Sequence, residues 1–246
     1  MHPADTLYLS KFYNDTVACC STCNGTGLNC ECGRRYQLEY AKVSAGIPAV
    51  HRQADISKIT DPQYRRQCAA VADYVDNLLQ HTYTGVGAYM YGGTGTAKTY
   101  LACYILIKAI EKGLGPVKFT TRAELSDVVH PGQGATSLDS YLSTITTYRL
   151  LALDNVSFYY KADRVGLSFS DYVFQRVIHA RASAGLPTIF TSRTAPSVFA
   201  ADCEARDIPF PSMNSGTMSV IAFDGTPYTE RKHAPKKIGD KPHKNR

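Results

Sequence analysis

The glycine-rich stretch Gly-Gly-Thr-Gly-Thr-Ala-Lys-Thr occupies residues 92–99, between two regular segments. The apolar run 88–91 before it predicts a strand, and the stretch 100–112 after it is compatible with a helix. This arrangement is typical of a phosphate-binding loop, in which backbone N–H groups and the positive end of the helix converge on a polyphosphate. We therefore expect a nucleoside triphosphate, ATP, to bind at Gly92, Gly93, Thr94, Gly95, Thr96, Ala97, Lys98 and Thr99.

Two side chains of this loop have predicted chemical roles. The Lys98 ammonium would reach the β- and γ-phosphates as a point charge, and the Thr99 hydroxyl would bind Mg²⁺. We expect Gly92 and Gly95 to have positive φ angles, and Ala97 to lie in the first helical turn, where alanine has no steric cost. The alternative is a glycine-rich hairpin that only resembles the motif, but the flanking segments and the Lys-Thr pair favour nucleotide binding.

A second part of the nucleotide site is predicted at the end of the apolar run 149–154. An apolar run that ends in an acid, Asp154, is typical of a buried parallel strand carrying a Mg²⁺-binding carboxylate. Open α/β sheets place their ligands at this carboxyl end of the strands. Its position about 55 residues after the Lys-Thr pair supports this interpretation.

The order of strands and helices predicts an α/β fold. The chain alternates apolar strand-like runs with helical segments, among them 122–129, 137–147 and 169–184. We expect a parallel sheet of order 5-1-4-3-2, flanked by helices, with no helical lid after the last strand. The five expected strands are residues 88–91, 117–121, 149–154, 186–193 and 218–223.

Composition is consistent with a globular chain that can bury a core and has a basic end. The 246 residues are 44% hydrophobic and carry a formal net charge of +6. Seven Lys or Arg residues against the single Asp240 make residues 231–246 a basic tail, which is either a solvated, disordered end or a non-specific nucleic-acid contact. No run resembles a signal peptide or a membrane span, so we expect a cytoplasmic protein without membrane contact.

Five of the eight cysteines lie close together near the N-terminus. Cys20-x2-Cys23 and Cys30-x-Cys32 supply four thiolates, which suit tetrahedral Zn²⁺. In so short a segment, metal binding would supply most of the folding free energy. Two disulfides and an iron–sulfur cluster remain alternatives, and Cys19 could replace Cys20 as a ligand.

Several of these stretches together resemble a known family, the DnaC/DnaI-type helicase loaders. The resemblance covers roughly residues 20–230 and is closest to phage and prophage versions, with the IstB transposition helpers as near relatives. The stretches that carry it are Cys-Asn-Gly-Thr-Gly at 23–27, Ala-Gly-Ile-Pro at 45–48, the phosphate-binding loop, Leu-Leu-Ala-Leu-Asp at 150–154 and Pro-Thr-Ile-Phe-Thr-Ser at 187–192.

The resemblance implies an AAA+ ATPase core, at residues 51–230. It also implies that residues 1–50 form a zinc-binding module that grips the replicative hexameric DNA helicase, followed after the core by the basic tail 231–246. The core of such loaders binds ATP and single-stranded DNA, and the loaders self-associate on the helicase ring. Relatives usually have an acid directly after the Mg²⁺-binding Asp154, where this chain has Asn155.

An amide at residue 155 can orient a water molecule but cannot accept its proton. Either hydrolysis is slow, or a carboxylate from elsewhere, such as Asp163 or Asp171, replaces the missing acid. We favour slow hydrolysis, with ATP acting as a switch. The resemblance also predicts a γ-phosphate sensor at the end of the strand 186–193, where Thr191 and Ser192 are the candidates and Ser192 is the one we assign.

Three further contacts are expected outside the nucleotide loop. The resemblance implies that Arg122 contacts a single-stranded DNA phosphate and that Arg181 reaches the γ-phosphate of a neighbouring subunit as an arginine finger. Tyr160 and Lys161 suit base stacking and backbone contact with DNA. Arg122 and Arg181 could instead be ordinary surface arginines, and Tyr160 could instead be a tyrosine packed against a helix.

These inferences together predict an ATP-dependent helicase loader with weak ATPase activity. One alternative is an IstB-like transposition helper that assembles on double-stranded DNA, although the cysteine module argues against it. A stand-alone metabolic NTPase or kinase is the other alternative. It would need an acceptor pocket with a catalytic base, and the sequence has no motif for one.

Overall fold

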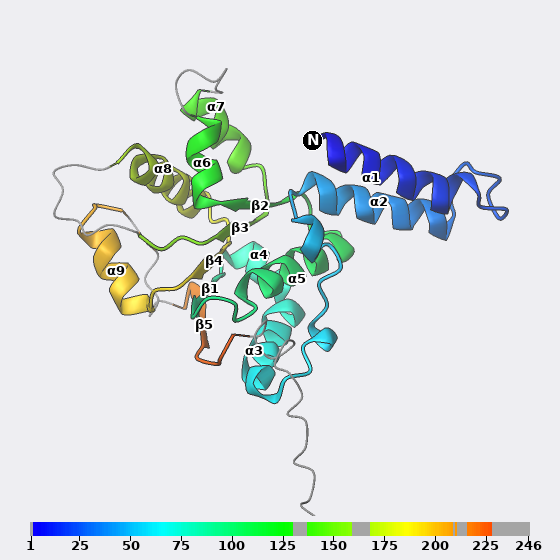
Figure 1. The fold of residues 1–246 in the computed structure, drawn as a ribbon. Helices are drawn as coiled ribbons and strands as arrows, with labels where there is room; N and C mark the ends of the chain where they lie inside the picture. Colours follow the sequence, from blue (N-terminus) through cyan, green and yellow to red (C-terminus); the bar gives the residue numbers. More distant parts are fainter. Residues whose placement is uncertain (1, 130–136, 159–167, 209, 211–215, 228–246) are drawn as a thin grey trace, which may run out of the picture.

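The computed structural model describes residues 2–129, 137–158, 168–208, 210 and 216–227 (Figure 1). Its centre is a five-stranded sheet of order β2-β3-β4-β1-β5, in which all pairs are parallel. This confirms the predicted α/β fold and strand order. The strands are β1 (Gly87–Gly92), β2 (Val117–Thr121), β3 (Leu150–Asp154), β4 (Thr188–Ser192) and β5 (Met218–Phe223).

Both faces of the sheet are covered, and this explains why its central strands are almost continuously apolar. One face packs on α3 (Arg65–Asp76), α4 (Leu78–Thr84) and α5 (Lys98–Glu111) in a single hydrophobic cluster. The other face forms a second cluster with helices that follow β2, β3 and β4. Those helices are α6 (Arg122–Val128), α7 (Leu138–Ile145), α8 (Phe169–Ser183) and α9 (Pro196–Glu204).

Local capping signals fix where two of these helices begin. The Thr121 hydroxyl accepts the backbone N–H of Glu124, whose carboxylate accepts the N–H of Thr121, so α6 starts directly at the end of β2. Ser168 and Asp171 form the same reciprocal pair at the start of α8. Such capping boxes satisfy backbone donors that a helix start otherwise leaves unpaired.

The N-terminal helices form a separate projection. The helix α1 (Pro3–Tyr13), the π-helical turn η1 (Asn14–Ala18) and the helix α2 (Glu31–Ser44) make a hairpin, here called the Cys hairpin, which extends away from the sheet (Figure 1). The chain then crosses α5 through the short 3₁₀ turns η2 (Ala49–His51), η3 (Ile56–Lys58) and η4 (Pro62–Tyr64).

The chain joins the core before residue 50. Ala45, Ile47 and Ala54 are buried in the same cluster as α5, and the Phe119 N–H of β2 donates to the Ala45 carbonyl oxygen at 2.7 Å. A division between hairpin and core at residue 50 therefore stays a proposal. The basic tail and the predicted absence of a lid concern residues 228–246, which lie outside the described residues.

Within the described part of the chain, no helix combines the length and apolar character needed to cross a membrane.

Candidate functional site

The phosphate-binding loop connects β1 to α5, and its glycines have the predicted backbone. Gly92 and Gly95 have φ angles of 142° and 75°. A Cβ atom at Gly92 would lie 2.0 Å from the Phe223 carbonyl oxygen, so no other residue fits there without moving β5. The strand and the loop therefore constrain this glycine jointly.

The prediction for Ala97 is wrong. Ala97 lies outside the helix, as the N-cap of α5, with a left-handed φ of 65°, and the helix begins at Lys98. An alanine in this conformation costs roughly 1–2 kcal/mol because its Cβ approaches the following carbonyl. A glycine at this position would avoid that cost.

Lys98 folds back over the loop. Its Nζ donates to the carbonyl oxygens of Gly92 at 2.9 Å and Gly93 at 2.5 Å, and to the Thr96 hydroxyl at 3.0 Å. Burial lowers the pKa of the Lys98 ammonium to about 8. The charge thus lies inside the ring of backbone groups that a polyphosphate would enter, where phosphate oxygens can replace its present acceptors.

The two expected Mg²⁺ ligands are in direct contact. The Thr99 hydroxyl at the start of α5 donates to Asp154 Oδ1 at the end of β3, over 2.8 Å. Thr191 of β4 donates to the same oxygen at 2.5 Å. A carboxylate with two hydroxyls is the all-oxygen donor set that Mg²⁺ prefers in nucleotide sites.

Thr191, rather than Ser192, contacts this cluster. Its hydroxyl also accepts the Asn155 N–H at 3.0 Å, while Ser192 is 3.1 Å from the Ser157 hydroxyl. Successive strand residues point to opposite faces, so only one of the two hydroxyls can face Asp154. The apolar pattern of β4 does not identify the face, because Ile189 and Phe190 are adjacent and both buried. The choice of Ser192 therefore needed the partners that only the structure shows.

Asn155 has a left-handed backbone, with φ at 57°. Asparagine tolerates this conformation better than most residues, whereas a glutamate would be strained there. Its N–H is held by Thr191, as above. The structure therefore gives a backbone reason for a short polar side chain such as asparagine at this position.

The prediction that Arg122 contacts DNA is wrong. Arg122 is buried at the start of α6. Its guanidinium pairs with Asp171, donates to the Val156 carbonyl and lies 4.2 Å from the centre of the Phe158 ring. A side chain used in this way is not available to a phosphate.

Four further residues were proposed as a catalytic base or as DNA contacts, and the structure describes one of them, Asp171. Asp171 is tied to Arg122 and to the cap of α8, so it is not placed to act as the missing base. Asp163, Tyr160 and Lys161 lie outside the described residues.

The arginine-finger prediction for Arg181 is also wrong. The side chain is 1% exposed, and its guanidinium donates to the carbonyl oxygens of Ile145, Tyr148 and Pro187 and to the Thr188 hydroxyl, at 2.7–3.0 Å. Burial without a carboxylate partner lowers its pKa to about 9. Arg181 ties α7 and the start of β4 together inside the core, and it cannot reach a neighbouring subunit.

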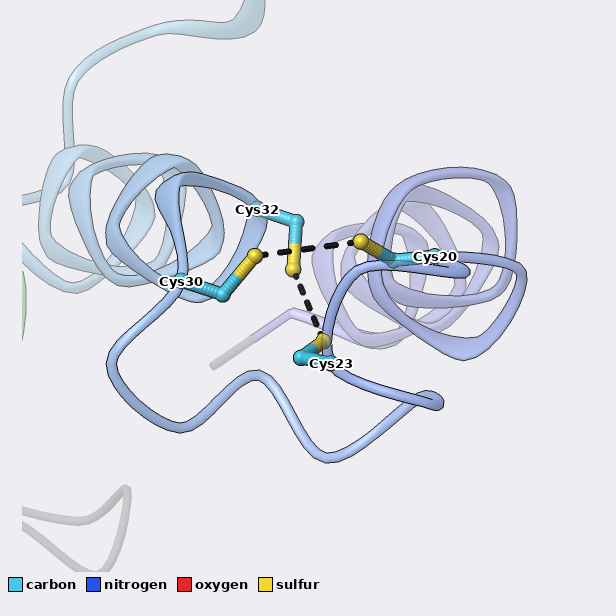
Figure 2. A group of neighbouring side chains, drawn as sticks. All are labelled: Cys20, Cys23, Cys30 and Cys32. Carbon is cyan, nitrogen blue, oxygen red and sulfur yellow. Dashed lines mark hydrogen bonds between the residues drawn. The ribbon is translucent and has the colours of Figure 1, made fainter.

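The four predicted zinc ligands lie together at the tip of the Cys hairpin (Figure 2). All sulfur atoms of Cys20, Cys23, Cys30 and Cys32 are within 4.8 Å of one another, and the Cys20–Cys30 and Cys23–Cys32 sulfur distances are 3.8 and 3.4 Å. Zn–S bonds of about 2.3 Å in a tetrahedron place neighbouring sulfurs about 3.8 Å apart. The arrangement therefore fits one Zn²⁺, which would serve as a closed structural site.

The thiols of the cluster are shifted in opposite directions: backbone N–H groups favour the thiolate at Cys20 and Cys23, whereas desolvation raises the pKa of the Cys32 thiol. The Gly27 N–H donates to Cys23 Sγ at 3.2 Å, and the backbone N–H groups of Cys23 and Thr22 lower the pKa of the Cys20 thiol to about 6. Cys19 is exposed and donates to the Asp15 carbonyl instead, so the structure places Cys20 in the cluster.

Known proteins share this fold and part of this sequence. The chain is 28% identical over 150 residues to the replicative helicase loader DnaI of Bacillus subtilis (strain 168). These residues are 61% of this chain and 45% of that protein, so the chain spans less than half the length of the curated relative it matches. No protein-family model matches the chain.

Solved structures agree on the fold. A crystal structure of DnaI has a TM-score of 0.55 at 20% identity, covering 73% of this chain and 93% of that one. The DnaC helicase loader has a TM-score of 0.57 at 16% identity, covering 72% of this chain and all of that one. DnaA bound to AMPPCP and single-stranded DNA has a TM-score of 0.52 at 16% identity, covering 73% of this chain and 51% of that one. The chain therefore shares the fold of the solved DnaI and DnaC structures, with a four-cysteine hairpin near its N-terminus.

Proposed function

We propose that this chain is an ATP-dependent loader that binds the replicative hexameric DNA helicase and delivers it onto single-stranded DNA during replication. The observation that carries the proposal is the contact between Thr99 and Asp154 below the phosphate-binding loop. It places both expected Mg²⁺ ligands together, in a fold shared with two helicase loaders.

ATP would act mainly as a switch. Lys98 and the loop from Gly92 would hold the phosphates, and Thr99 and Asp154 would hold Mg²⁺, which neutralises phosphate charge when bound. Asn155 cannot accept a proton from water, and Asp171 is engaged elsewhere. We therefore propose slow hydrolysis, with the bound nucleotide controlling the state of the loader.

The Cys hairpin is the proposed helicase-binding element. It projects from the core, and four thiolates at its tip would hold Zn²⁺ as a structural ion (Figure 1, Figure 2). The named relative is a replicative helicase loader, and this supports a helicase as the partner. Self-association on the helicase ring belongs to the same proposal.

Single-stranded DNA contact is proposed for the segment that carries Tyr160 and Lys161. A tyrosine ring stacks on any base, and a lysine beside it adds a phosphate contact. Arg122 and Arg181 take no part, because both guanidinium groups are used inside the core.

The experiment that tests the loader is native mass spectrometry of the chain with the replicative helicase of its host, with and without ATP and Mg²⁺. A defined complex is expected with the wild-type chain and not with Cys23→Ser. Deleting residues 1–50 is a poorer test, since Ala45 and Ile47 belong to the hydrophobic core.

Two results would overturn the proposal. No complex under any nucleotide condition, together with ATP-dependent assembly on duplex DNA, would support an IstB-like transposition helper instead. Unchanged ATP binding in Lys98→Ala would exclude the phosphate-binding loop as the nucleotide site.

A further inference from the structure

The Cys hairpin is fixed to the nucleotide-binding core by a buried polar network at its base. Asp5 of α1 pairs with Arg52 at 2.5 Å, and the Arg52 guanidinium lies 5.3 Å from the centre of the Tyr8 ring. Arg52 is 7% exposed and also donates to the Ile47 carbonyl oxygen at 3.1 Å. The first helix of the hairpin is thereby attached to the chain segment that follows the second.

A second set of contacts ties α2 to the same segment. Glu39 accepts from Tyr8 at 3.0 Å, from Lys42 at 2.7 Å and from Gln53 at 3.2 Å. Glu39 and Lys42 are both buried. The charges of this network form two ion pairs, Asp5–Arg52 and Glu39–Lys42. Buried ion pairs of this kind add little net stability, but they favour one defined geometry.

The other side of that segment contacts the first turn of α5. The His51 ring packs edge-on against Tyr100, with 5.9 Å between centroids. The Tyr100 hydroxyl accepts the Asp55 N–H at 2.8 Å and donates to the Asp55 carbonyl at 3.0 Å. Tyr100 directly follows Thr99, whose hydroxyl is on Asp154.

Residues 47–55, here called the brace, therefore contact the hairpin through Arg52 and Gln53. Through His51 and Asp55 they contact Tyr100 in the first turn of α5, directly after the phosphate-binding loop. We propose that the brace couples nucleotide binding to the orientation of the Cys hairpin, with Arg52 as the positioning residue. This inference rests on the proposed function, because it concerns the regulation of the same nucleotide site.

By thermodynamic linkage, the proposed coupling can be measured either as a change in the hairpin on nucleotide binding or as a change in nucleotide affinity when the hairpin is loosened. If nucleotide changes how firmly the hairpin is held, loosening the hairpin changes nucleotide affinity by the same factor. The brace fixes the Tyr100 side chain in the first turn of α5, so releasing it adds an ordering cost to nucleotide binding. We expect Arg52→Gln to weaken ATP binding by about fivefold, at the lower end of typical couplings.

The test combines calorimetric ATP titration with amide hydrogen exchange of the full chain. In the wild type, ATP with Mg²⁺ should slow exchange at residues 92–99, in the brace and in α1. Arg52→Gln and Asp5→Asn should keep the response at 92–99 and lose the response in α1. Because Asp5 is partly exposed, Asp5→Asn serves as the milder variant should Arg52→Gln fold poorly.

Arg34→Gln is the matched control, because it removes an exposed ion pair with Glu31 on the same hairpin. It should leave ATP affinity and the α1 response unchanged, and bound zinc should stay constant in all three variants. ATP binding to the wild type without any response in α1, or unchanged ATP affinity in both network variants, would overturn the brace alone. A wild-type chain that binds no ATP would overturn the proposed function as well.

Discussion

The Cys hairpin and the α/β core are held together by different means. The core buries two hydrophobic clusters, one on each face of its sheet. The hairpin has few buried apolar side chains, namely Leu9, Val17, Cys32 and Val43, and it exposes Leu7, Tyr13 and Tyr40 on its helices. Two helices with so little burial are marginal without a further constraint.

Function and fold depend on the same residues in the hairpin but on different residues in the core. In the hairpin, the four cysteines would be both the distinguishing chemical feature and the main source of order. In the core, the nucleotide loop lies at the edge of a sheet that apolar burial already stabilises. Changes at the cysteines should therefore remove structure, whereas changes at the loop should remove binding and leave structure intact.

The largest effect is expected at the zinc ligands. Cys23→Ser should abolish zinc binding and unfold the hairpin, since metal binding supplies on the order of 10 kcal/mol in such segments. Elemental analysis and hydrogen exchange of α1 and α2 would measure this, and the core should keep its urea midpoint. Cys19→Ser is the matched control, because Cys19 is exposed and outside the cluster. Loss of zinc in the control, or its retention in Cys23→Ser, would contradict the assignment.

The next effect concerns the core and leaves the hairpin intact. Arg181→Met should lower the free energy of unfolding by about 3 kcal/mol or more, because it leaves the buried carbonyl oxygens of Ile145, Tyr148 and Pro187 without their donor. Urea denaturation would measure this, with bound zinc unchanged. Arg176→Met on the exposed side of the same helix is the control and should change the stability little. If Arg181→Met destabilised the protein no more than Arg176→Met, the structural role of Arg181 would be contradicted.

The architecture of the core could be predicted from sequence because its signals are local. Apolar runs, the glycine-rich turn and the acid at Asp154 indicated the strands, whose expected order the structure confirms, and the four cysteines were identified by their spacing. In each case the residues that matter are neighbours in the chain or follow the period of a strand.

The failures share a physical cause, since burial and long-range partners are not visible in a sequence. Arg122 and Arg181 were expected at interfaces, yet Asp171 holds the first and carbonyl oxygens distant in the chain hold the second. The left-handed backbone of Ala97 is imposed by the folded loop, and the brace depends on Asp5 meeting Arg52 across the hairpin. Charged residues on helices look alike in a sequence whether they face solvent or the core.

A smaller effect should separate binding from folding at the nucleotide loop. Lys98→Ala should weaken ATP binding by at least about tenfold, because a charge-assisted contact is lost, while the urea midpoint of the core changes little. Isothermal titration calorimetry and urea denaturation would measure the two quantities. A large loss of stability in Lys98→Ala would show that the phosphate-binding loop also stabilises the core, so that binding and folding would be coupled there as in the hairpin.

The pKa of Lys98 adds a pH test of the same residue. Burial lowers this pKa from 10.5 to about 8, so between these values the unfolded chain binds more protons than the folded one. The stability of the nucleotide-free protein should therefore rise with pH across this window. ATP affinity should fall over the same window, because the ammonium loses its charge. In Lys98→Ala, both contributions should be absent, and a pH dependence equal to that of the wild type would assign it to another group.

The smallest effect decides which strand hydroxyl belongs to the nucleotide site. Thr191→Val keeps the shape of the side chain but removes the hydroxyl that Asp154 and the Asn155 N–H share. We expect about fivefold weaker Mg²⁺-dependent ATP binding, equivalent to about 1 kcal/mol for one lost hydrogen bond. Ser192→Ala removes the neighbouring hydroxyl, which faces Ser157, and should leave this affinity unchanged. ATP titration with and without Mg²⁺ would measure both variants. The reverse result would show that Ser192, and not Thr191, contacts the nucleotide site when ATP is bound. The nucleotide would then order its own site in the core, much as zinc is expected to order the hairpin.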